Sequence, residues 1–577
     1  MAPLLDVRDL SVVFQSGKRR TEAVRNLSYT LNPGETLAIV GESGSGKSVS
    51  SLALLGLLAK PAGRVTSGTA RFDGRDLLAM PERELERLRG DRITMIFQEP
   101  MTSLNPVLTI GRQLTEGLMV HKGLGHAAAT ARAVEMLDVV GLPEPRRQLR
   151  RYPHQLSGGM RQRVMIAMAM ASDPAILIAD EPTTALDVTI QAQILDLMRD
   201  LKRDFDTSII LITHDMGVVA ETADRVVVMY RGEKVEEGPV ARIFAEPRQA
   251  YTKRLLAAVP RLGSLAHTER PMRFATDGAA RPGPALPAHP APLLETFGLT
   301  KRFGGRHGTL AMDDVGFSLA AGETLALVGE SGSGKSTTGR AILRLIEVDK
   351  GQIWLEGHDI REHESQMLRR ARREMQMIFQ DPFAALNPRM SAGRLVAEPM
   401  LIHGIARGRE LEDRTAQLFA RVGLERDHMR RFPHEFSGGQ RQRLCIARAL
   451  GVGPKLLVAD EPTSALDVSV QAQVIDLMLE LQEELGLSYL FISHDMAVVE
   501  RVSHRVAVMH RGRIVEMGPR RDVLGDPYHA YTRSLLAAVP VPDPTHVRGT
   551  LPKLDVAALP RGPLVEIAKG HHVATAA

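Results

Sequence analysis

The stretch GESGSGKS occurs twice in this chain, at Gly41–Ser48 and at Gly329–Ser336. Each copy follows a short apolar run, Thr36–Val40 or Thr324–Val328, which predicts a buried strand. Each copy then leads into a run that is compatible with a helix. A glycine-rich turn between a strand and a helix lets backbone N–H groups and the helix N-terminus surround a phosphate. The stretch therefore predicts two phosphate-binding loops, and the alternative is a glycine-rich turn that binds nothing.

The residues of these loops have separate predicted roles. Lys47 and Lys335 place a positive charge on the β- and γ-phosphates, and Ser48 and Ser336 supply a hydroxyl ligand for Mg²⁺. The other loop residues present backbone N–H groups to the phosphates. They are Gly41, Ser43, Gly44, Gly46, Gly329, Ser331, Gly332 and Gly334.

Length and composition narrow the class of protein. A chain of 577 residues is too long for one core and predicts several domains. The net charge of +5 is mild for this length and does not indicate a nucleic-acid-binding protein. The single cysteine, Cys445, excludes an internal disulfide and a cysteine-based zinc site. No apolar run approaches about 18 residues and no signal peptide follows Met1, so we expect neither a membrane span nor export.

The whole chain repeats, with the same order of motifs in both copies. In each copy antiparallel strands come first, and strands that alternate with helices follow, which predicts a parallel α/β core. We therefore predict two tandem domains, residues 1–260 and 293–540, joined by a Pro/Ala-rich linker at 261–292. Residues 541–577 are weakly patterned and predict a loosely structured tail.

An Asp-Glu pair follows an apolar strand in both copies, at Asp180–Glu181 and at Asp460–Glu461. At the end of a strand the aspartates can reach the Mg²⁺ shell, and the glutamates can orient or deprotonate the attacking water. The alternative for such a pair is a helix N-cap, since Glu-Pro is a good helix start. The position of the pair between two other repeated motifs favours the catalytic interpretation.

A histidine and a glutamine accompany this pair in each copy. His214 and His494 end β-branched strands and are predicted to hydrogen-bond the γ-phosphate, although a lone histidine at a strand end is more often structural. Gln98 and Gln380 also end strands and are candidate ligands of Mg²⁺ or of the attacking water. The alternative for each glutamine is an exposed strand end.

A Ser-Gly-Gly stretch opens a predicted helix in each copy, as LSGGM and as FSGGQ. The serines can cap these helices, which leaves the glycine N–H groups free to bind an anion. Met160 stands where the second copy has glutamine, and we expect a mild effect because the serine and the glycine amides contact phosphate. The residues predicted to bind nucleotide here are Ser157, Gly158, Gly159, Ser437, Gly438, Gly439 and Gln440.

Together these motifs make the chain resemble the tandem ATP-binding subunits of ABC transporters, over about residues 4–260 and 293–540. The resemblance implies an α/β fold with two tandem ABC-type P-loop NTPase domains. Each domain would have a RecA-like parallel-sheet core, an antiparallel β subdomain and a helical signature subdomain. The resemblance also implies hydrolysis of ATP with Mg²⁺ and stacking of adenine on Phe14 and Phe303, for which a place in the core is the alternative.

The ABC arrangement implies that the two halves act together. Each signature helix is expected to face the phosphate loop of the opposite half. One site would pair Gly41–Ser48 with Ser437–Gln440, and the other would pair Gly329–Ser336 with Ser157–Met160. ATP would then join the halves through contacts that ADP lacks. Since both sites keep a glutamate and a histidine, we expect both to hydrolyse ATP.

Within this family the chain is similar to the ATPases of dipeptide, oligopeptide, glutathione and nickel importers. The similarity lies in the segments Gln98–Pro106 and Gln380–Pro388 and in the tails Ala250–Pro260 and Ala530–Pro540. It implies as partners two membrane-spanning permease subunits and an extracytoplasmic substrate-binding protein. It places the chain at the cytoplasmic face of the membrane as a peripheral protein, without a direct nucleic-acid partner.

The segments after Gln98 and Gln380 carry apolar side chains. By family analogy they form grooves for short helices of the membrane subunits, and the alternative is helical core. These side chains are Met101, Leu104, Phe383 and Leu386. Some ATPases of this kind carry a cysteine cluster in the C-terminal extension, but this chain lacks it, so we expect no iron–sulfur cluster.

Other classes share these motifs. Tandem ABC proteins of ribosomes usually join their halves by a long charged helix, whereas residues 261–292 are short and Pro-rich. DNA-repair ABC ATPases carry zinc modules, which a single cysteine excludes. A structural dimer without catalysis is disfavoured because no motif residue is missing. The cargo stays open between glutathione, dipeptides, longer peptides and nickel, and the resemblance favours glutathione or small peptides.

Overall fold

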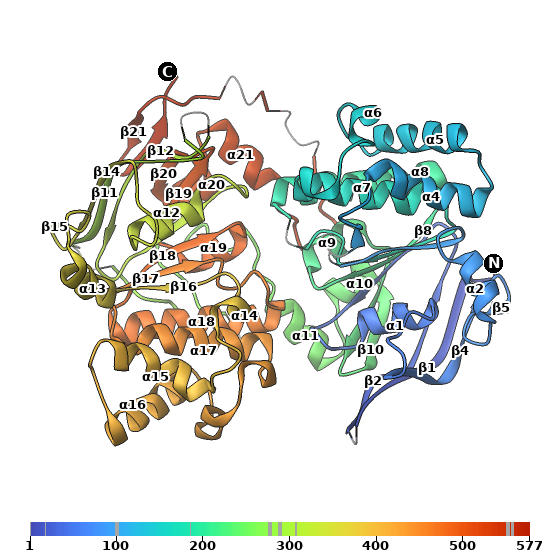
Figure 1. Ribbon diagram of the computed structural model, residues 1–577, viewed down its shortest axis with the longest axis horizontal. Coiled ribbons are helices and arrows are strands. Elements are labelled where there is room, and N and C mark those ends of the chain that lie inside the picture. The colour runs from blue at the N-terminus through green and yellow to red at the C-terminus, as the bar shows by residue number, and fades with distance from the viewer. Residues whose placement is uncertain are drawn as a thin grey trace. The chain divides into compact units, whose positions relative to one another are not determined.

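Both phosphate-loop stretches follow a strand that lies inside a parallel sheet. The computed structural model describes residues 2–17, 19–98, 103–184, 186–274, 280–286, 291–305, 308–549, 554–555 and 559–576. The chain divides into two units, each with one copy of the repeat (Figure 1). Unit 1 consists of Met1–Leu186, Ile190–Val259 and Pro540–Gly549. Unit 2 consists of Asp187–Thr189, Pro260–Val539 and Thr550–Ala577.

A six-stranded sheet forms the centre of unit 1. Its strands are β3 (Thr36–Val40), β6 (Ile93–Ile96), β7 (Ile176–Asp180), β8 (Ser208–Thr213), β9 (Arg225–Tyr230) and β10 (Glu233–Pro239). The order is β10-β9-β3-β8-β7-β6, and all neighbours are parallel except β10, which is antiparallel to β9. β3, β7 and β8 are buried along their whole length, which explains their unbroken apolar runs.

A smaller antiparallel sheet covers one face of this parallel sheet. It contains β1 (Leu5–Ser16), β2 (Arg19–Leu31), β4 (Gly63–Phe72) and β5 (Arg75–Asp76), in the order β2-β1-β4-β5. Its buried side chains share a cluster with Leu37 and Ile39 of β3. Ala38 and Val40, which alternate with them, belong to a cluster on the other face. The strand that leads into the phosphate loop is therefore packed from both sides.

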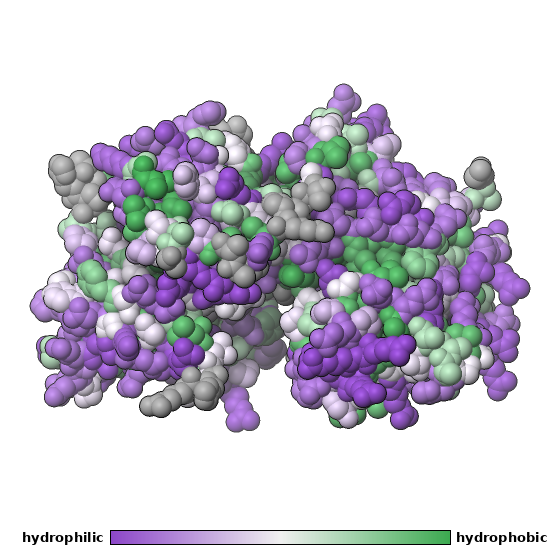
Figure 2. All heavy atoms as spheres, turned by 90° about the horizontal axis from the view of Figure 1, so that it is seen from above, coloured by the Kyte–Doolittle hydropathy of each residue, from purple (hydrophilic) through white to green (hydrophobic). Residues whose placement is uncertain are grey.

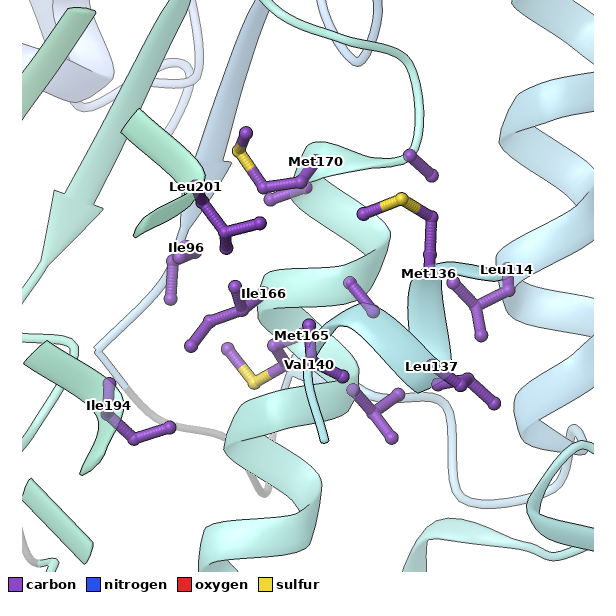
Figure 3. Close-up of a cluster of buried hydrophobic side chains, with 14 of the residues drawn as sticks. Ile96, Leu114, Met136, Leu137, Val140, Met165, Ile166, Met170, Ile194 and Leu201 are labelled. Carbon is purple, nitrogen blue, oxygen red and sulfur yellow. The ribbon is translucent and has the colours of Figure 1, made fainter. Parts of the chain in front are cut away.

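The helices of unit 1 divide between the sheets and a separate helical part. They are α1 (Lys47–Leu54), α2 (Glu82–Leu88), α4 (Ile110–Lys122), α5 (His126–Val139), α6 (Pro145–Gln148), η1 (Pro153–Gln155), α7 (Gly158–Met170), α8 (Val188–Phe205), α9 (Met216–Thr222), α10 (Val240–Ala245) and α11 (Ala250–Ala257). In the helical part, Met165, Ile166 and Met170 of α7 pack with Leu114 of α4 and Met136 of α5 (Figure 3). This buried cluster anchors the helix that the LSGGM stretch opens.

Unit 2 repeats this plan with a larger central sheet. Its strands are β13 (Thr324–Val328), β16 (Met375–Ile378), β17 (Leu456–Asp460), β18 (Ser488–Ser493), β19 (Arg505–His510), β20 (Arg513–Pro519), β21 (Leu564–Ala568) and β22 (His571–Ala574). The order is β16-β17-β18-β13-β19-β20-β22-β21. The antiparallel sheet, in the order β12-β11-β14-β15, consists of β11 (Pro292–Phe303), β12 (Thr309–Ala320), β14 (Lys350–Leu355) and β15 (His358–Asp359).

The helices of unit 2 follow the order of those in unit 1, with α14 in addition among the described residues and η2 in place of α6. They are α12 (Lys335–Ile342), α13 (Ser365–Glu374), α14 (Pro382–Ala385), α15 (Ala392–Ile402), α16 (Gly408–Arg421), η2 (Arg426–Arg430), η3 (Pro433–Glu435), α17 (Gly438–Leu450), α18 (Val468–Leu485), α19 (Met496–Val502), α20 (Arg520–Gly525) and α21 (Ala530–Ala537). Among the described residues, no helix is long and apolar enough to cross a membrane. Hydrophilic side chains also predominate on the face shown in Figure 2.

Two segments outside the two repeated domains pack against unit 2. The tail at 541–577 was expected to be loosely structured, but β21 and β22 extend the central sheet of unit 2 beside β20. The hairpin is held by His571, whose Nε2 lies 2.9 Å from Oε1 of the fully buried Glu516. The linker at 261–292 is not free of the core either, because Leu265 and Phe274 are buried in unit 2. Neither segment has a periodic apolar pattern, so these contacts could not be predicted from the sequence.

Candidate active site

The two phosphate loops adopt the same tightly curved backbone. Gly41 and Gly46 have φ values of +151° and +96°, and a Cβ at these positions would lie 2.2 Å from the Met229 carbonyl oxygen and 2.4 Å from that of Ala23. The matching glycines of unit 2 make the same close approaches. Only glycine allows both the dihedral angles and the contacts. The crest of each loop stays exposed at Ser43, Gly44, Ser331 and Gly332.

The lysine of each loop lies inside the curve. Lys47 Nζ donates to the carbonyl oxygens of Gly41 and Glu42 at 2.7 and 2.9 Å, and the ammonium group of Lys335 makes the matching bonds at 2.7 and 2.8 Å. Both side chains are buried, and burial lowers the pKa of Lys335. The ammonium groups therefore lie at the centre of the loops, where they can meet phosphate oxygens.

A serine–aspartate pair lies next to each lysine. Ser48 donates to Asp180 at 2.9 Å, and Ser336 donates to Asp460 at 2.8 Å. Burial raises the pKa of Asp180 to about 6 and raises that of Asp460 in the same direction. The serine hydroxyl and the aspartate carboxylate are hard oxygen ligands, and Oδ2 of Asp460 is buried and unpaired among the described residues. These oxygens fit a divalent cation such as Mg²⁺.

The next residue in unit 1, Glu181, is held in a strained position by three side chains. Its φ of +48° is unusual for a non-glycine residue. One carboxylate oxygen lies 3.2 Å from Nδ1 of His214, and the other accepts hydrogen bonds from Gln98 and Thr184, both at 2.9 Å. Burial raises the pKa of Glu181, but the bond and charge of His214, with the Thr184 hydroxyl, outweigh it and hold the pKa at about 2.

Unit 2 repeats the histidine and glutamine contacts, whereas Ser464, the counterpart of Thr184, donates to the backbone carbonyl of Glu461 at 3.2 Å and not to its carboxylate. Glu461 has a φ of +47°, lies 3.2 Å from Nδ1 of His494 and accepts from Gln380 at 2.9 Å. Burial lowers the pKa of His494, but the Glu461 carboxylate outweighs this effect and raises it. The predicted strand-end residues therefore meet in each unit, because the carboxyl ends of neighbouring parallel strands share one edge of the sheet.

The signature stretches cap their helices as expected but differ in one bond. Ser157 accepts from the backbone N–H of Met160 at 3.4 Å, and Ser437 accepts from that of Gln440 at 3.3 Å. The Gln440 side chain also accepts from the Ser437 N–H at 3.1 Å, a bond that the thioether of Met160 does not form. Gly158 and Gly438 are exposed at the helix starts, whereas a Cβ at Gly159 or Gly439 would approach a neighbouring side chain closely.

Phe14 and Phe303 have different surroundings. The ring of Phe14 is partly buried against Gly63, where an added Cβ would lie 2.8 Å from it. Phe303 is 46% exposed, and Nζ of Lys301 lies 5.7 Å from its ring centroid. Adenine stacking stays a prediction for both.

Two tyrosines support the loops and were not predicted as site residues. The hydroxyl of Tyr251 accepts from the N–H of Glu42 at 3.3 Å, and that of Tyr531 accepts from the N–H of Glu330 at 3.1 Å. Both tyrosines belong to the repeated AYT tails of α11 and α21. The repetition of the tails was a signal that could have identified them.

The apolar segments after the glutamines divide between core and surface. Leu104 and Leu386 are buried, whereas Phe383 is 61% exposed under the guanidinium of Arg441. Met101 lies outside the described residues. Each unit has an apolar hollow beside its glutamine. The hollow of unit 1 is lined by Leu57, Phe97, Leu104, Met165 and Met168. The hollow of unit 2 is lined by Leu345, Met377, Phe379, Ala385 and Cys445.

In both units a glycine-rich loop with a buried lysine lies next to a serine–aspartate pair and a glutamate that is held by glutamine and histidine. This combination on a parallel sheet defines the class of P-loop nucleoside triphosphatases. Two such units on one chain make the protein a tandem member of that class.

Comparison with known proteins agrees with this class. The family described as ABC transporter matches residues 24–184 and 312–464. The oligopeptide/dipeptide transporter C-terminal region matches residues 235–277 and 515–562. The chain is 54% identical to the glutathione import ATP-binding protein GsiA of Pectobacterium atrosepticum, over 99% of this chain and 96% of that protein. It is 52% identical to GsiA of Escherichia coli K12, over 94% and 91%.

The chain therefore belongs to the ABC transporter family, with two ATP-binding domains and the peptide-transporter C-terminal region in each half. The expected fold, family and ATP-hydrolysing activity are confirmed.

Proposed function

We propose that the chain is the ATP-hydrolysing subunit of an importer for glutathione or other small peptides. The relatives that it matches over nearly their whole length are described as glutathione import ATP-binding proteins. The observation that carries the proposal is the glutamate held by glutamine and histidine beside a serine–aspartate pair, which occurs in both units. Two complete sites are what a motor with two productive ATPase halves needs.

ATP binds at each loop through the backbone N–H groups and the lysine. Ser48 and Asp180 in unit 1, and Ser336 and Asp460 in unit 2, would hold Mg²⁺, with the neighbouring glutamine as a further ligand. Mg²⁺ bound there would offset negative charge on the β- and γ-phosphate oxygens. The strands and the phosphate loop already hold the serine, aspartate and glutamine side chains in place. These side chains therefore need to move little when the nucleotide binds.

Glu181 and Glu461 orient the attacking water. A carboxylate with a pKa of about 2, as for Glu181, is ionised at neutral pH but is a weak base. Its main contribution is therefore a strong hydrogen bond that holds the water in line with the γ-phosphate. The histidine keeps the carboxylate in place and can also reach the γ-phosphate.

By analogy with the ABC arrangement, each site would be completed by the other half of the chain. The exposed start of α17, at Ser437 and Gly438, would contact the γ-phosphate bound at Gly41–Ser48. The start of α7, at Ser157 and Gly158, would contact the γ-phosphate bound at Gly329–Ser336. The helix N-termini supply N–H groups that suit an anion. Because ADP lacks the γ-phosphate, hydrolysis would release the halves.

The partners are two permease subunits in the membrane, which receive cargo from an extracytoplasmic binding protein. The apolar hollows beside Gln98 and Gln380 are suited to an amphipathic helix of each permease. Their exposed rims include Leu57 and Phe97 in unit 1. Since Phe97 precedes Gln98, movement of a docked helix would reach the nucleotide site directly. The chain would thus lie on the cytoplasmic face of the membrane.

The proposal is tested by reconstituting the chain with its two permeases in vesicles and adding the binding protein. We expect ATPase activity to rise when the binding protein carries glutathione, together with uptake of labelled glutathione. A dipeptide that stimulates more strongly than glutathione would move the cargo assignment to dipeptides. Co-purification with ribosomes instead of two membrane proteins would contradict the transport function.

A further inference from the structure

α11 and α21 are the last helices that correspond in the two halves. The segment that follows each of them belongs to the opposite unit. α11 belongs to unit 1, but Pro260–Val539, which follows it, belongs to unit 2. α21 belongs to unit 2, but Pro540–Gly549 belongs to unit 1. The two helices correspond, with the sequences AYTKRLLA and AYTRSLLA. We call Pro260–Phe274 the first tail and Pro540–Gly549 the second tail. The first tail leaves unit 1 and packs in unit 2, and the second tail leaves unit 2 and packs in unit 1.

The first tail is bound to α18 and α19 of unit 2. Phe274 is buried, and its backbone N–H donates to Asp476 of α18 at 2.8 Å. The guanidinium of Arg501 in α19 lies 4.3 Å from the Phe274 ring centroid. Arg501 also donates to the carbonyl oxygen of Arg273 at 3.0 Å. One arginine of the unit thus holds both an aromatic side chain and the backbone of the tail.

The first tail also satisfies a buried charge. Arg520 at the start of α20 is 2% exposed. It donates to the carbonyl and the hydroxyl of Thr268, the latter at 2.9 Å, and to the carbonyl of Arg270 at 3.3 Å. Without the tail these donors would lose most of their partners, which is costly for a buried charge. The first tail is therefore an integral part of unit 2.

The second tail is bound to α8 and α9 of unit 1. Arg548 donates to Asp196 of α8 at 2.6 Å, and its other terminal nitrogen lies 3.5 Å from the Glu221 carboxylate of α9. The side chains of Arg548 and Glu221 are 6% and 2% exposed. At the start of the tail, Pro540 packs so closely on Gly217 that a Cβ there would lie 2.9 Å from it.

The tails bind to corresponding faces, formed by α8 and α9 in unit 1 and by α18 and α19 in unit 2. The two faces differ in charge. α8 and α18 contain QAQILDL and QAQVIDL, so Asp196 and Asp476 correspond. α9 and α19 contain VVAET and VVERV, so Glu221 corresponds to Arg501. Exchange of the tails would bring Arg548 beside Arg501, where two positive charges repel each other. Each face therefore fits only one of the two tails.

We propose that the exchanged tails form a clasp that holds the two halves together independently of nucleotide. The clasp keeps the halves at high effective concentration while ATP joins and releases them at the nucleotide sites. The surfaces are the α8/α9 and α18/α19 faces, and the partner of each is the tail from the other half. This inference does not depend on the identity of the cargo.

The test cuts the chain between the halves. A specific protease site replaces residues 287–290, and the purified protein is cut in buffer without nucleotide. We expect the two fragments to stay associated in size-exclusion chromatography and in a dilution series. Phe274→Ala together with Arg548→Ala is expected to raise the dissociation constant of the fragments at least tenfold, whereas Val547→Ala, at an 89% exposed position of the second tail, leaves it unchanged.

Thermal unfolding of the uncut variants shows whether both halves stay folded. Should the double variant unfold, Arg548→Gln alone, which removes the charge but keeps a shorter polar side chain, is compared with Val547→Ala in the same dilution series. Cut fragments that separate without nucleotide would overturn the clasp. So would folded Phe274 and Arg548 variants that dissociate no more readily than the Val547 control.

Discussion

Replacing one catalytic glutamate at a time tests whether the two sites are equivalent. In Glu181→Gln and Glu461→Gln the amide keeps the size of the carboxylate but removes its charge. In both units the carboxylate lies 3.2 Å from a histidine nitrogen and 2.9 Å from a glutamine nitrogen, so the two losses should be similar. The Thr184 hydroxyl, which bonds to the Glu181 carboxylate, is a difference between the two sites. Loss of the group that orients the water lowers turnover at that site by roughly 10²- to 10⁴-fold. Each single variant then keeps about half of the activity if the sites act independently, and less if they are coupled.

The assay is phosphate release at saturating ATP, with ATP binding measured in parallel to show that each altered site still fills. Glu144→Gln, which changes an exposed carboxylate paired with Arg147, is the matched control and should behave like the unaltered chain. Full activity in either single variant, with ATP bound at both sites, would refute the equivalence drawn from these distances.

Three further changes have defined outcomes. Gly46→Ala would place a Cβ 2.4 Å from a carbonyl oxygen, and we expect loss of ATP binding at the first loop, measured with a fluorescent nucleotide analogue. Ile166→Ala, at a fully buried position of the cluster in Figure 3, should lower the free energy of unfolding by about 2–5 kcal/mol in a denaturant titration. Burial lowers the pKa of His504 to about 4 in the folded chain. On acidification, His504 is therefore protonated in the unfolded chain at a higher pH than in the folded chain. The stability from this neutral histidine is present above about pH 6.5 and lost towards pH 4, by roughly 3 kcal/mol, and His504→Gln should flatten this part of a melting-temperature profile against pH.

Much of the fold and the site could be predicted because the signals are local. The loop stretches need particular glycines, and the buried parallel strands are unbroken apolar runs. The meeting of Asp180, Glu181, His214 and Gln98 followed from a general rule, since residues at the carboxyl ends of neighbouring parallel strands share an edge. The bonds that hold Glu181 in place fit this rule, although the roles of these residues in catalysis stay predictions.

The remaining features depend on contacts that no local pattern records. Arg548 and Asp196 are 352 positions apart and lie in segments without a shared motif. The hairpin β21–β22 is short and mostly exposed on β21, and one buried contact between His571 and Glu516 anchors it. Tyr251 and Tyr531 lie in the repeated tails, so the sequence contained a signal for them. Their hydrogen bonds to the phosphate loops became apparent only from the fold.

The most direct test of the account is a structure of the full chain with Glu181→Gln and Glu461→Gln, loaded with ATP and Mg²⁺. The account predicts that each γ-phosphate lies within hydrogen-bond distance of a phosphate loop from one half and of Ser157 or Ser437 from the other half. Two ATP molecules that each contact residues of one half only, or halves that stay apart with ATP bound, would contradict it.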